Sequence, residues 1–180
     1  MRLGAHMSAA GGAYKAFARG EEVGCDSMLI FTKSNRMWKA KPLSEKDIAA
    51  YHKTAAESSI RPVAVHASYL INIASPDDVL WEKSFQALKV EIERACALDI
   101  PFVTFHPGSH MKSTPEEGLA RIAKGVKRVL AETADSCPDT TLCLETMAGQ
   151  GTNLGYKFEH LASIMEQAGQ NERLGVCFDT

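Results

Sequence analysis

The segment FVTFHPG, residues 102–108, is an apolar run that ends on His106 and then breaks at Pro107 and Gly108. Five other segments of the chain share this design. They are RLGAH (2–6), SMLIFTK (27–33), PVAVHAS (62–68), TLCLETMAG (141–149) and LGVCFDT (174–180). Their apolar residues are consecutive rather than alternating, which is typical of strands that are buried on both faces in a parallel sheet. The sequence therefore predicts six parallel strands.

Helical patterns separate these segments. Apolar residues recur at spacings of three and four over residues 79–98, 115–134 and 158–168. Thr114 has the residue type and position of the N-cap of the second of these helices, and Ser44 is the expected cap of another helix. The strand–helix order continues without a linker, so we predict a single α/β domain over residues 1–180.

Polar side chains follow the predicted strands, and their positions distinguish two architectures. They are His6, Lys33, His66, His106, Glu145 and Asp179, separated by steps of 27 to 40 residues. A closed barrel places reactive groups from many strands at one rim, whereas an open doubly wound sheet concentrates its ligand after one glycine-rich turn. No G-x-G-x-x-G pattern follows a strand here. We therefore predict a (β/α)8 TIM barrel, with about six of its eight units in this chain.

Composition limits the class of function. The 180 residues carry 20 Lys and Arg against 22 Asp and Glu, a formal net charge of -2. This balance excludes binding of nucleic acid through overall basicity, although a local basic patch is compatible with it. No apolar run approaches the roughly 18 residues of a membrane span, so we expect no membrane partner. Five isolated cysteines indicate a reduced, cytoplasmic compartment.

Four of the strand-end residues have the chemistry of metal ligands. The runs VAVH, VTFH, LCLE and VCFD end on His66, His106, Glu145 and Asp179. An imidazole or carboxylate at the end of a buried strand needs a hydrogen bond, solvent or a metal ion. Two histidines and two carboxylates are a ligand set for zinc or manganese. A single such histidine is more often a hydrogen-bonded core or loop residue, but four of them on successive strands favour a metal site.

Two loops beside these residues suggest a partner. The segment TKSNRMWKAKP (32–42) places Lys33 and Arg36 near Trp38, a combination that suits phosphate contact and base stacking. A solvated basic loop with Trp38 packed on a neighbouring helix explains it equally well. After the third strand, Tyr69 and Leu70 either cover the barrel mouth or act as an apolar wedge in duplex DNA.

The order of six motifs is more specific than any one of them. GAHMSAAGG, FTKSNRMW, HASYLIN, FHPGSH, ETMAGQGTNLGYKFEHL and GVCFDT occur in this order along the chain. Together they closely resemble the endonuclease IV family of apurinic/apyrimidinic endonucleases. The resemblance runs over residues 1 to 180 essentially without gaps.

The resemblance implies a zinc-dependent deoxyribonuclease of base excision repair, built on a TIM barrel with up to three zinc ions. Such enzymes use zinc-activated hydroxide to cut double-stranded DNA on the 5′ side of an abasic site. The cut leaves a 3′-hydroxyl and a 5′-deoxyribose phosphate, and blocked 3′ ends are also trimmed. No side-chain nucleophile and no obligate protein partner are expected.

The resemblance also assigns roles to single residues. His66 and His106 would bind one zinc, and Glu145 would bridge it to a second zinc. Asp179 would bind this second ion, with His6 as a supporting residue. Arg36 resembles the residue that is inserted into the DNA stack. Tyr69 and Leu70 resemble the minor-groove wedge, with Lys33 and Trp38 as further DNA contacts.

The motifs supply fewer metal ligands than the family pattern requires. Only His66, His106, Glu145 and Asp179 are found, which completes one site, half-completes a second and leaves the third without ligands. We therefore expect the sequence to be part of a longer enzyme. Two alternatives stay open: a sugar isomerase or epimerase on a related metal-binding barrel, and a metal-deficient, inactive form of the nuclease. The first offers no reason for the basic loop and the wedge.

Overall fold

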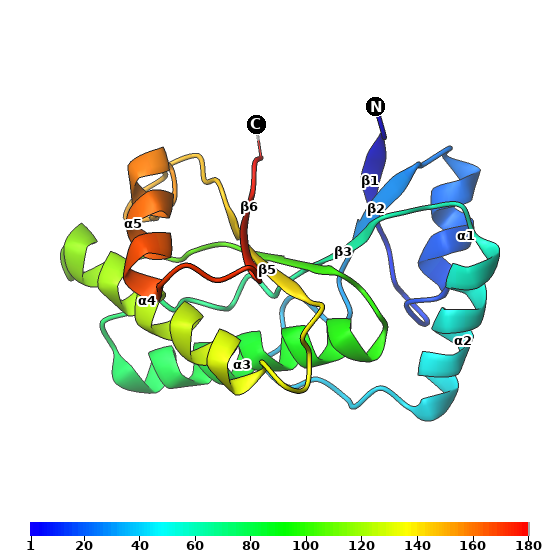
Figure 1. The fold of residues 1–180 in the computed structure, drawn as a ribbon, viewed down its shortest axis with the longest axis horizontal. Coiled ribbons are helices and arrows are strands. Elements are labelled where there is room, and N and C mark those ends of the chain that lie inside the picture. Colours follow the sequence, from blue (N-terminus) through cyan, green and yellow to red (C-terminus); the bar gives the residue numbers. More distant parts are fainter. Residues whose placement is uncertain (180) are drawn as a thin grey trace.

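Six parallel strands form one sheet in the order of the chain (Figure 1). The computed structural model describes residues 1–179, so Thr180, the last residue of the sixth predicted segment, lies outside the described residues. The strands are β1 (Gly4–Met7), β2 (Ser27–Ile30), β3 (Val63–His66), β4 (Phe102–Phe105), β5 (Thr141–Glu145) and β6 (Leu174–Cys177). Each observed strand lies within a predicted segment, except that β1 extends one residue beyond RLGAH (2–6), to Met7. The predicted parallel α/β order is confirmed.

Helices fill the connections between the strands. They are α1 (Lys15–Glu22), α2 (Glu45–Glu57), α3 (Asp78–Ala97), α4 (Pro115–Glu132) and α5 (Phe158–Ala168). Ser44 and Thr114 are N-caps as predicted, and each forms a capping box with the acidic residue three positions later. The apolar pattern did not locate α1, because this helix has only eight residues and buries just Ala16, Phe17 and Gly20.

Alternate residues of each strand face opposite sides of the sheet. Val65, Val103 and Leu142 are paired neighbours in successive strands, and all three are fully buried in the hydrophobic core beneath the helices. On the other side of the same strands, Thr104 pairs with His66 and with Cys143. The apolar core therefore lies between sheet and helices, and the opposite side of the sheet carries polar groups.

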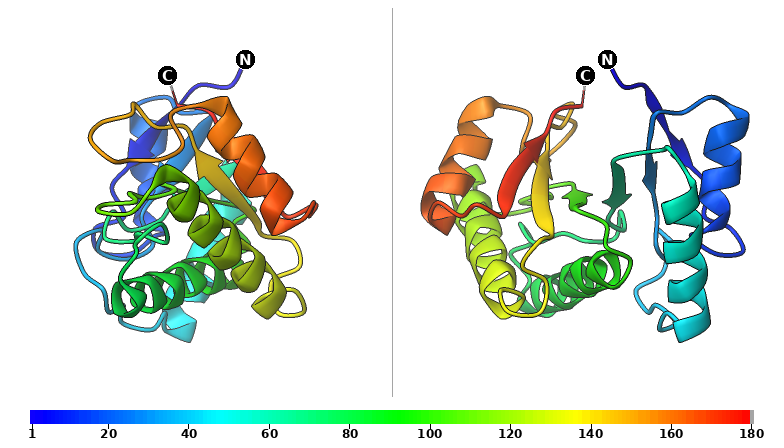
Figure 2. Two further views of the ribbon diagram at one scale, coloured as in Figure 1. Left: turned by 90° about the vertical axis from the view of Figure 1, so that its left-hand side faces the viewer. Right: turned by 45° about the vertical axis from the view of Figure 1, so that its right-hand side comes forward.

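The sheet is curved, with the helices along its outer side (Figure 2). Because the strands are parallel, their carboxyl ends gather along one rim. The loops that follow β2, β3, β4 and β5 all lie at this rim. None of the helices in the described part of the chain is both long and apolar enough to cross a membrane.

Candidate metal centre at the strand ends

Three of the four predicted metal ligands meet at the carboxyl ends of β3, β4 and β5. One ligand atom from each of His66, His106 and Glu145 lies within 4.8 Å of the others. His66 Nε2 is 3.1 Å from Glu145 Oε2, and His106 Nε2 is 3.6 Å from Glu145 Oε1. Each carboxylate oxygen therefore faces one imidazole, which is the convergence that the sequence predicted for these three residues.

Hydrogen bonds behind the cluster orient two of these side chains. His66 Nδ1 donates to the carbonyl of Ala67 at 2.6 Å, because a carbonyl can only accept. In neutral His66 the lone pair then resides on Nε2, the atom that faces Glu145. Thr104 Oγ1 donates to Glu145 Oε2 at 3.3 Å and holds the carboxylate from the neighbouring strand. Groups of the chain itself therefore orient His66 and Glu145.

The charges of the cluster are mutually stabilising. Burial would raise the pKa of the Glu145 carboxyl, but hydrogen bonds and charge from His106 and His66 outweigh it and lower the pKa to about 2. For His66, burial opposes protonation, yet the hydrogen bonds that the ring donates to Glu145 and to the Ala67 carbonyl raise its pKa overall. His66 is 4% exposed and Glu145 7% exposed, so this is a partly desolvated site.

The set has the composition of a divalent metal site. Two imidazole nitrogens and one carboxylate fit a borderline cation such as zinc, which in catalytic sites keeps positions open for water and substrate. One ligand atom of each residue lies within 4.8 Å of the others, so a single cation could contact all three side chains. The cluster could therefore hold a metal ion.

Asp179 and His6, also predicted from the strand ends, lie beside this cluster. Asp179 is exposed after β6, where its backbone N–H donates to Thr146 Oγ1 at 2.7 Å. The His6 ring stacks at 6.1 Å from the His66 ring. Within the described residues, the group that could hold an ion contains neither of them. The role of Asp179 as a ligand to a second metal stays a prediction.

The loop after β3 covers part of the His66–His106–Glu145 cluster. The Tyr69 ring lies 4.9 Å from the His66 ring and 5.3 Å from the His106 ring, yet Tyr69 is 53% exposed. Leu70 beside it is half-buried. Tyr69 thus has one face on the ligands and one toward solvent, which is compatible with both roles that the sequence left open, covering the barrel mouth and entering a partner.

The basic loop after β2 is divided between exposed and packed residues. Arg36 is exposed, as a residue that enters a partner must be. The Lys33 side chain is 5% exposed and its amine lies 3.1 Å from Glu91. Trp38 is half-buried, with the Lys83 amine 4.3 Å above its ring. For Trp38 this favours the packed alternative, and direct DNA contact by Lys33 or Trp38 stays a prediction.

A known protein family matches most of the chain. The model of a family described as xylose isomerase-like TIM barrel matches residues 17–180. The chain belongs to this family. The predicted TIM-barrel class is thereby confirmed, and the six strands described above are the portion of the xylose isomerase-like barrel that this chain supplies.

Within the xylose isomerase-like barrels, the chain is similar to endonuclease IV over 99% of its length. It is 52% identical over 179 residues to a protein of Chloroflexus aurantiacus named probable endonuclease 4, covering 99% of this chain and 62% of that protein. The crystal structure of endonuclease IV from Thermus thermophilus is 33% identical and superposes with a TM-score of 0.84, over 99% of this chain and 62% of that one. The resemblance to endonuclease IV is confirmed. The chain spans about 62% of the length of these relatives.

A structure of a D-tagatose 3-epimerase-like protein shares the barrel too. It superposes with a TM-score of 0.78 over 99% of this chain and 65% of that one, at 22% sequence identity. At this identity the likeness shows the fold alone. Barrels of this fold therefore include proteins named for different classes of substrate. Differences in the loops at the rim have to account for these different substrates.

Two residues that the sequence analysis missed connect the rim loops of this barrel. Asn72 Oδ1 accepts from the Ser109 N–H at 2.9 Å, and Asn72 Nδ2 donates to the Ser109 carbonyl at 3.0 Å, joining the loops after β3 and β4. Glu91 of α3 is 1% exposed. Nothing in the sequence marks Asn72, but Glu91 lies four positions from Ala87 and from Ala95 on the buried side of α3, where a charge needs a partner.

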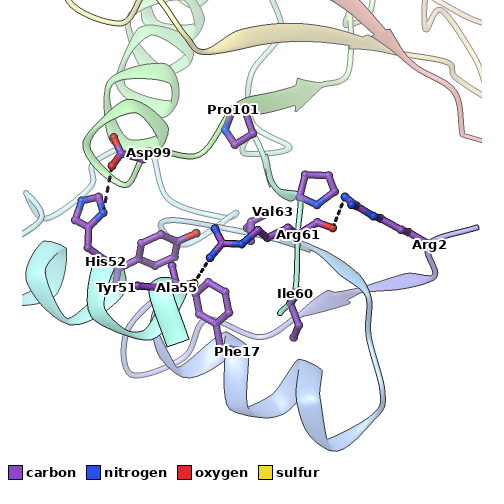
Figure 3. Close-up of a pocket in the computed structure, with 12 residues that line it drawn as sticks. Arg2, Phe17, Tyr51, His52, Ala55, Ile60, Arg61, Val63, Asp99 and Pro101 are labelled. Carbon is purple, nitrogen blue, oxygen red and sulfur yellow. Dashed lines mark hydrogen bonds and ion pairs between the residues drawn. The ribbon is translucent and has the colours of Figure 1, made fainter. Parts of the chain in front are cut away.

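A pocket of about 510 Å³ lies at the opposite end of the barrel, near the amino ends of β3 and β4 (Figure 3). Its charged groups have partners within the chain. Arg2 Nη1 donates to the Arg61 carbonyl at 2.8 Å, and His52 Nδ1 lies 3.3 Å from Asp99. The functional groups of TIM barrels lie at the carboxyl ends of the strands. We therefore assign the candidate site to the His66–His106–Glu145 cluster and not to this pocket.

Proposed function

We propose that the protein is a DNA repair endonuclease that hydrolyses the phosphodiester bond on the 5′ side of an apurinic/apyrimidinic site. The products would be a 3′-hydroxyl and a 5′-deoxyribose phosphate, and blocked 3′ ends would also be trimmed. One observation carries the proposal. The His66–His106–Glu145 cluster lies at the catalytic rim of a chain whose relatives are named endonuclease 4.

We propose zinc as the metal, held first by His66, His106 and Glu145. Two imidazoles and a carboxylate are an established ligand set for catalytic zinc, and the hydrogen bond from His66 Nδ1 to the Ala67 carbonyl leaves Nε2 as the ligand atom of this ring. Asp179 would join Glu145 at a second ion. When bound, zinc makes water a nucleophile near neutral pH and stabilises negative charge on the phosphate and on the leaving oxygen. Further ions, up to three, would need ligands beyond those named.

The residues of the chain have their own parts in this proposal. Glu145 holds two imidazoles through two different oxygens, so it fixes the distance between them. Tyr69 lies over both rings and would limit access of bulk water while facing the DNA. An abasic nucleotide has lost its stacking and pairing, so moving it out of the helix costs less than flipping an intact nucleotide. Arg36, Tyr69 and Leu70 would fill the space that it leaves.

The proposed partner is double-stranded DNA with abasic sites, bound without an obligate protein partner. The near-neutral net charge of -2 means that the contact must be local, and exposed Arg36 supplies one cation beside the cluster. We propose the cytoplasm as the compartment, which is supported by cysteines that are all free in the described structure.

A duplex with a single abasic site tests the function. We expect one cut on its 5′ side by the zinc-loaded protein, loss of cutting after chelation, and recovery when zinc is restored. The same duplex with an intact base is the control. An uncut abasic duplex, together with turnover of a ketose sugar, would replace the proposal with a sugar epimerase.

The metal content of the purified chain provides a second test. One site has three protein ligands and the next has only Glu145 and Asp179, so we expect about one tightly bound zinc per chain. Elemental analysis after gel filtration measures it. A chain that folds but binds no zinc would support a metal-deficient, inactive form, and three tightly bound ions would contradict the ligand count.

A further inference from the structure

Glu91 is a buried carboxylate in the middle of α3, a helix that supplies no residue to the His66–His106–Glu145 cluster. It is 1% exposed and lies among the buried residues of the helix. A carboxylate in such a place is stable only when its lone pairs are satisfied by donors or cations. Its partners therefore show what the residue holds in place.

Both oxygens of Glu91 are bonded to rim loops. Oε1 lies 3.1 Å from Lys33 Nζ and accepts from the backbone N–H of Ser68 at 3.0 Å. Oε2 accepts from Thr32 Oγ1 at 3.4 Å. Thr32 and Lys33 begin the loop that carries Arg36, and Ser68 precedes Tyr69. One carboxylate thus joins the two loops that are proposed to enter DNA.

The same residues connect the loops to each other. Lys33 Nζ also donates to the carbonyl of Met37 at 3.2 Å, which closes its own loop around Arg36. Ser68 Oγ donates to the carbonyl of Asn35 at 2.8 Å, across from the loop after β3 to the loop after β2. Arg36 is therefore flanked on both sides by residues bonded to this network.

Helix α3 holds the outer parts of both loops as well. Arg94, one turn beyond Glu91, donates through Nη1 to the Lys41 carbonyl at 2.9 Å and through Nε to Thr32 Oγ1 at 3.2 Å. Its Nη2 donates to the Thr32 carbonyl. Ser84 Oγ accepts from the Asn72 N–H at 3.0 Å. The helix is thus a common support for residues 32–42 and 66–72.

We propose that Glu91, through its ion pair with Lys33, is a positioning residue for DNA recognition. It fixes the loop that carries Arg36 relative to the loop that carries Tyr69 and Leu70, so that both enter one abasic gap together. The inference rests on the proposed function, because that function assigns the two loops to DNA. Preorganised loops lose less conformational freedom on binding, which is how a residue without DNA contact raises affinity.

The variant Glu91→Gln tests this, with Glu93→Gln as its matched control. Glu93 is exposed on the same helix and loses the same charge. In Glu91→Gln we expect amide hydrogen exchange over 32–42 and 66–72 to rise about tenfold, with exchange in β5 unchanged. We expect KM for abasic duplex to rise about tenfold, the loss that one disrupted charged hydrogen bond predicts, while kcat and zinc content stay at the parental level. Glu93→Gln should match the parent.

The variant Lys33→Met tests the same ion pair from its other partner if Glu91→Gln does not fold. It leaves Glu91 with the Ser68 and Thr32 donors and removes only the cation. We expect the same loosening of both loops in Lys33→Met, and unchanged exchange in both loops would overturn the positioning role. Where Glu91→Gln folds, we expect a double variant no worse than the more severe single one, because the two residues act as a pair.

The outcomes separate this inference from the proposed function. A parent protein that cuts abasic DNA while Glu91→Gln keeps the parental KM overturns the positioning role alone. So does a loss that appears in zinc content or in kcat with unchanged loop exchange. A parent that neither binds nor cuts abasic DNA overturns the proposed function and the DNA role of Glu91 together.

Discussion

The two ends of the sheet arrange their polar groups in different ways. At the amino end, each charged group beside the large pocket is paired inside the chain. Arg61 Nη2 donates to the Ala55 carbonyl at 2.7 Å, as Arg2 does to the Arg61 carbonyl. At the carboxyl end, His66 and His106 both direct a ring nitrogen at one Glu145 carboxylate. The first arrangement pairs each charge with a neighbour in the chain, whereas the second brings three ligand atoms together where one cation could contact all of them.

The difference shows why cavity size is a poor guide to function here. The pocket of about 510 Å³ lies at the amino end, whereas the pocket that Tyr69, Asn72 and His106 help to line at the carboxyl end has only about 180 Å³. Reactivity depends on groups that converge where a substrate or a metal ion can contact them. Substitutions at the carboxyl end should therefore change chemistry, and substitutions at the amino end should change little.

The largest effect is expected from Glu145→Gln. The amide keeps the shape of the side chain but removes the charge that both histidines and a cation need. Metal contributes several kcal/mol to such reactions and each 1.4 kcal/mol is tenfold in rate, so we expect cleavage of abasic duplex to fall by about 10³-fold or more. Zinc content, measured by elemental analysis, should fall with it. Full activity in this variant would remove the contrast between the two ends.

A smaller effect at the same end is expected from Tyr69→Ala. Its ring is half exposed above the ligands, and side chains that stack on bases contribute about 1–3 kcal/mol each. We expect preference for abasic over intact duplex to fall about tenfold in a binding assay, with zinc content unchanged. Tyr69→Phe keeps the ring and should behave as the parent. Loss of zinc in Tyr69→Ala would show that the ring supports the ligands instead.

The metal-free protein should show the electrostatics of the cluster in its pH dependence. The pKa of Glu145 is lowered from 4.5 to about 2, so its stabilising contribution is complete above pH 4.5 and is lost as the pH falls toward 2. The pKa of His66 is raised from 6.5, so its contribution is complete below pH 6.5 and is lost at higher pH. The pair is therefore most stabilising between pH 4.5 and pH 6.5.

Thermal unfolding of chelated parent and Glu145→Gln measures this window. We expect the parent to exceed the variant by about 2–4 °C between pH 4.5 and 6.5, the shift that about 1 kcal/mol produces in a chain of this size. The difference should shrink on both sides of the window. A constant difference across pH would mean that the cluster is not stabilised by its charges.

The smallest effect is expected from His52→Gln at the amino end. The His52 side chain is 38% exposed and its partner Asp99 is 84% exposed, and such surface pairs contribute below about 1 kcal/mol. We expect the free energy of unfolding in urea to change by less than that, with parental zinc content and cleavage. A loss of cleavage in this variant would place function at the wrong end of the sheet.

The sequence predicted which residues meet at the rim, because parallel strands place their carboxyl ends at the same edge of the sheet. Once VAVH, VTFH and LCLE are taken as buried parallel strands, their last residues must meet, and His66, His106 and Glu145 do. Asp179 is not in the group of described residues that could hold an ion, and its backbone N–H donates to Thr146 Oγ1. No spacing in the sequence encodes that hydrogen bond.

The loops were less predictable, for a physical reason. Lys33 resembles a surface cation because its neighbours in sequence are polar, yet its side chain is buried and its amine is paired with Glu91, 58 positions later. Trp38 likewise depends on Lys83 of α3. Local composition shows which charges a loop carries, and a distant helix decides which of them remain available.

The alternation of the strands has a consequence for how this scaffold could be altered. In β4 and β5, Val103, Leu142 and Leu144 are sealed beneath the helices, whereas Thr104 and Cys143 share the side of Glu145. Alternate positions of each strand therefore form two sets of residues, one that packs in the core and one that faces the side of the candidate site. A library that randomises only the second set would vary residues on the side of the site while the core residues that hold the barrel stay unchanged. Natural or laboratory selection could then alter the reaction without altering the core.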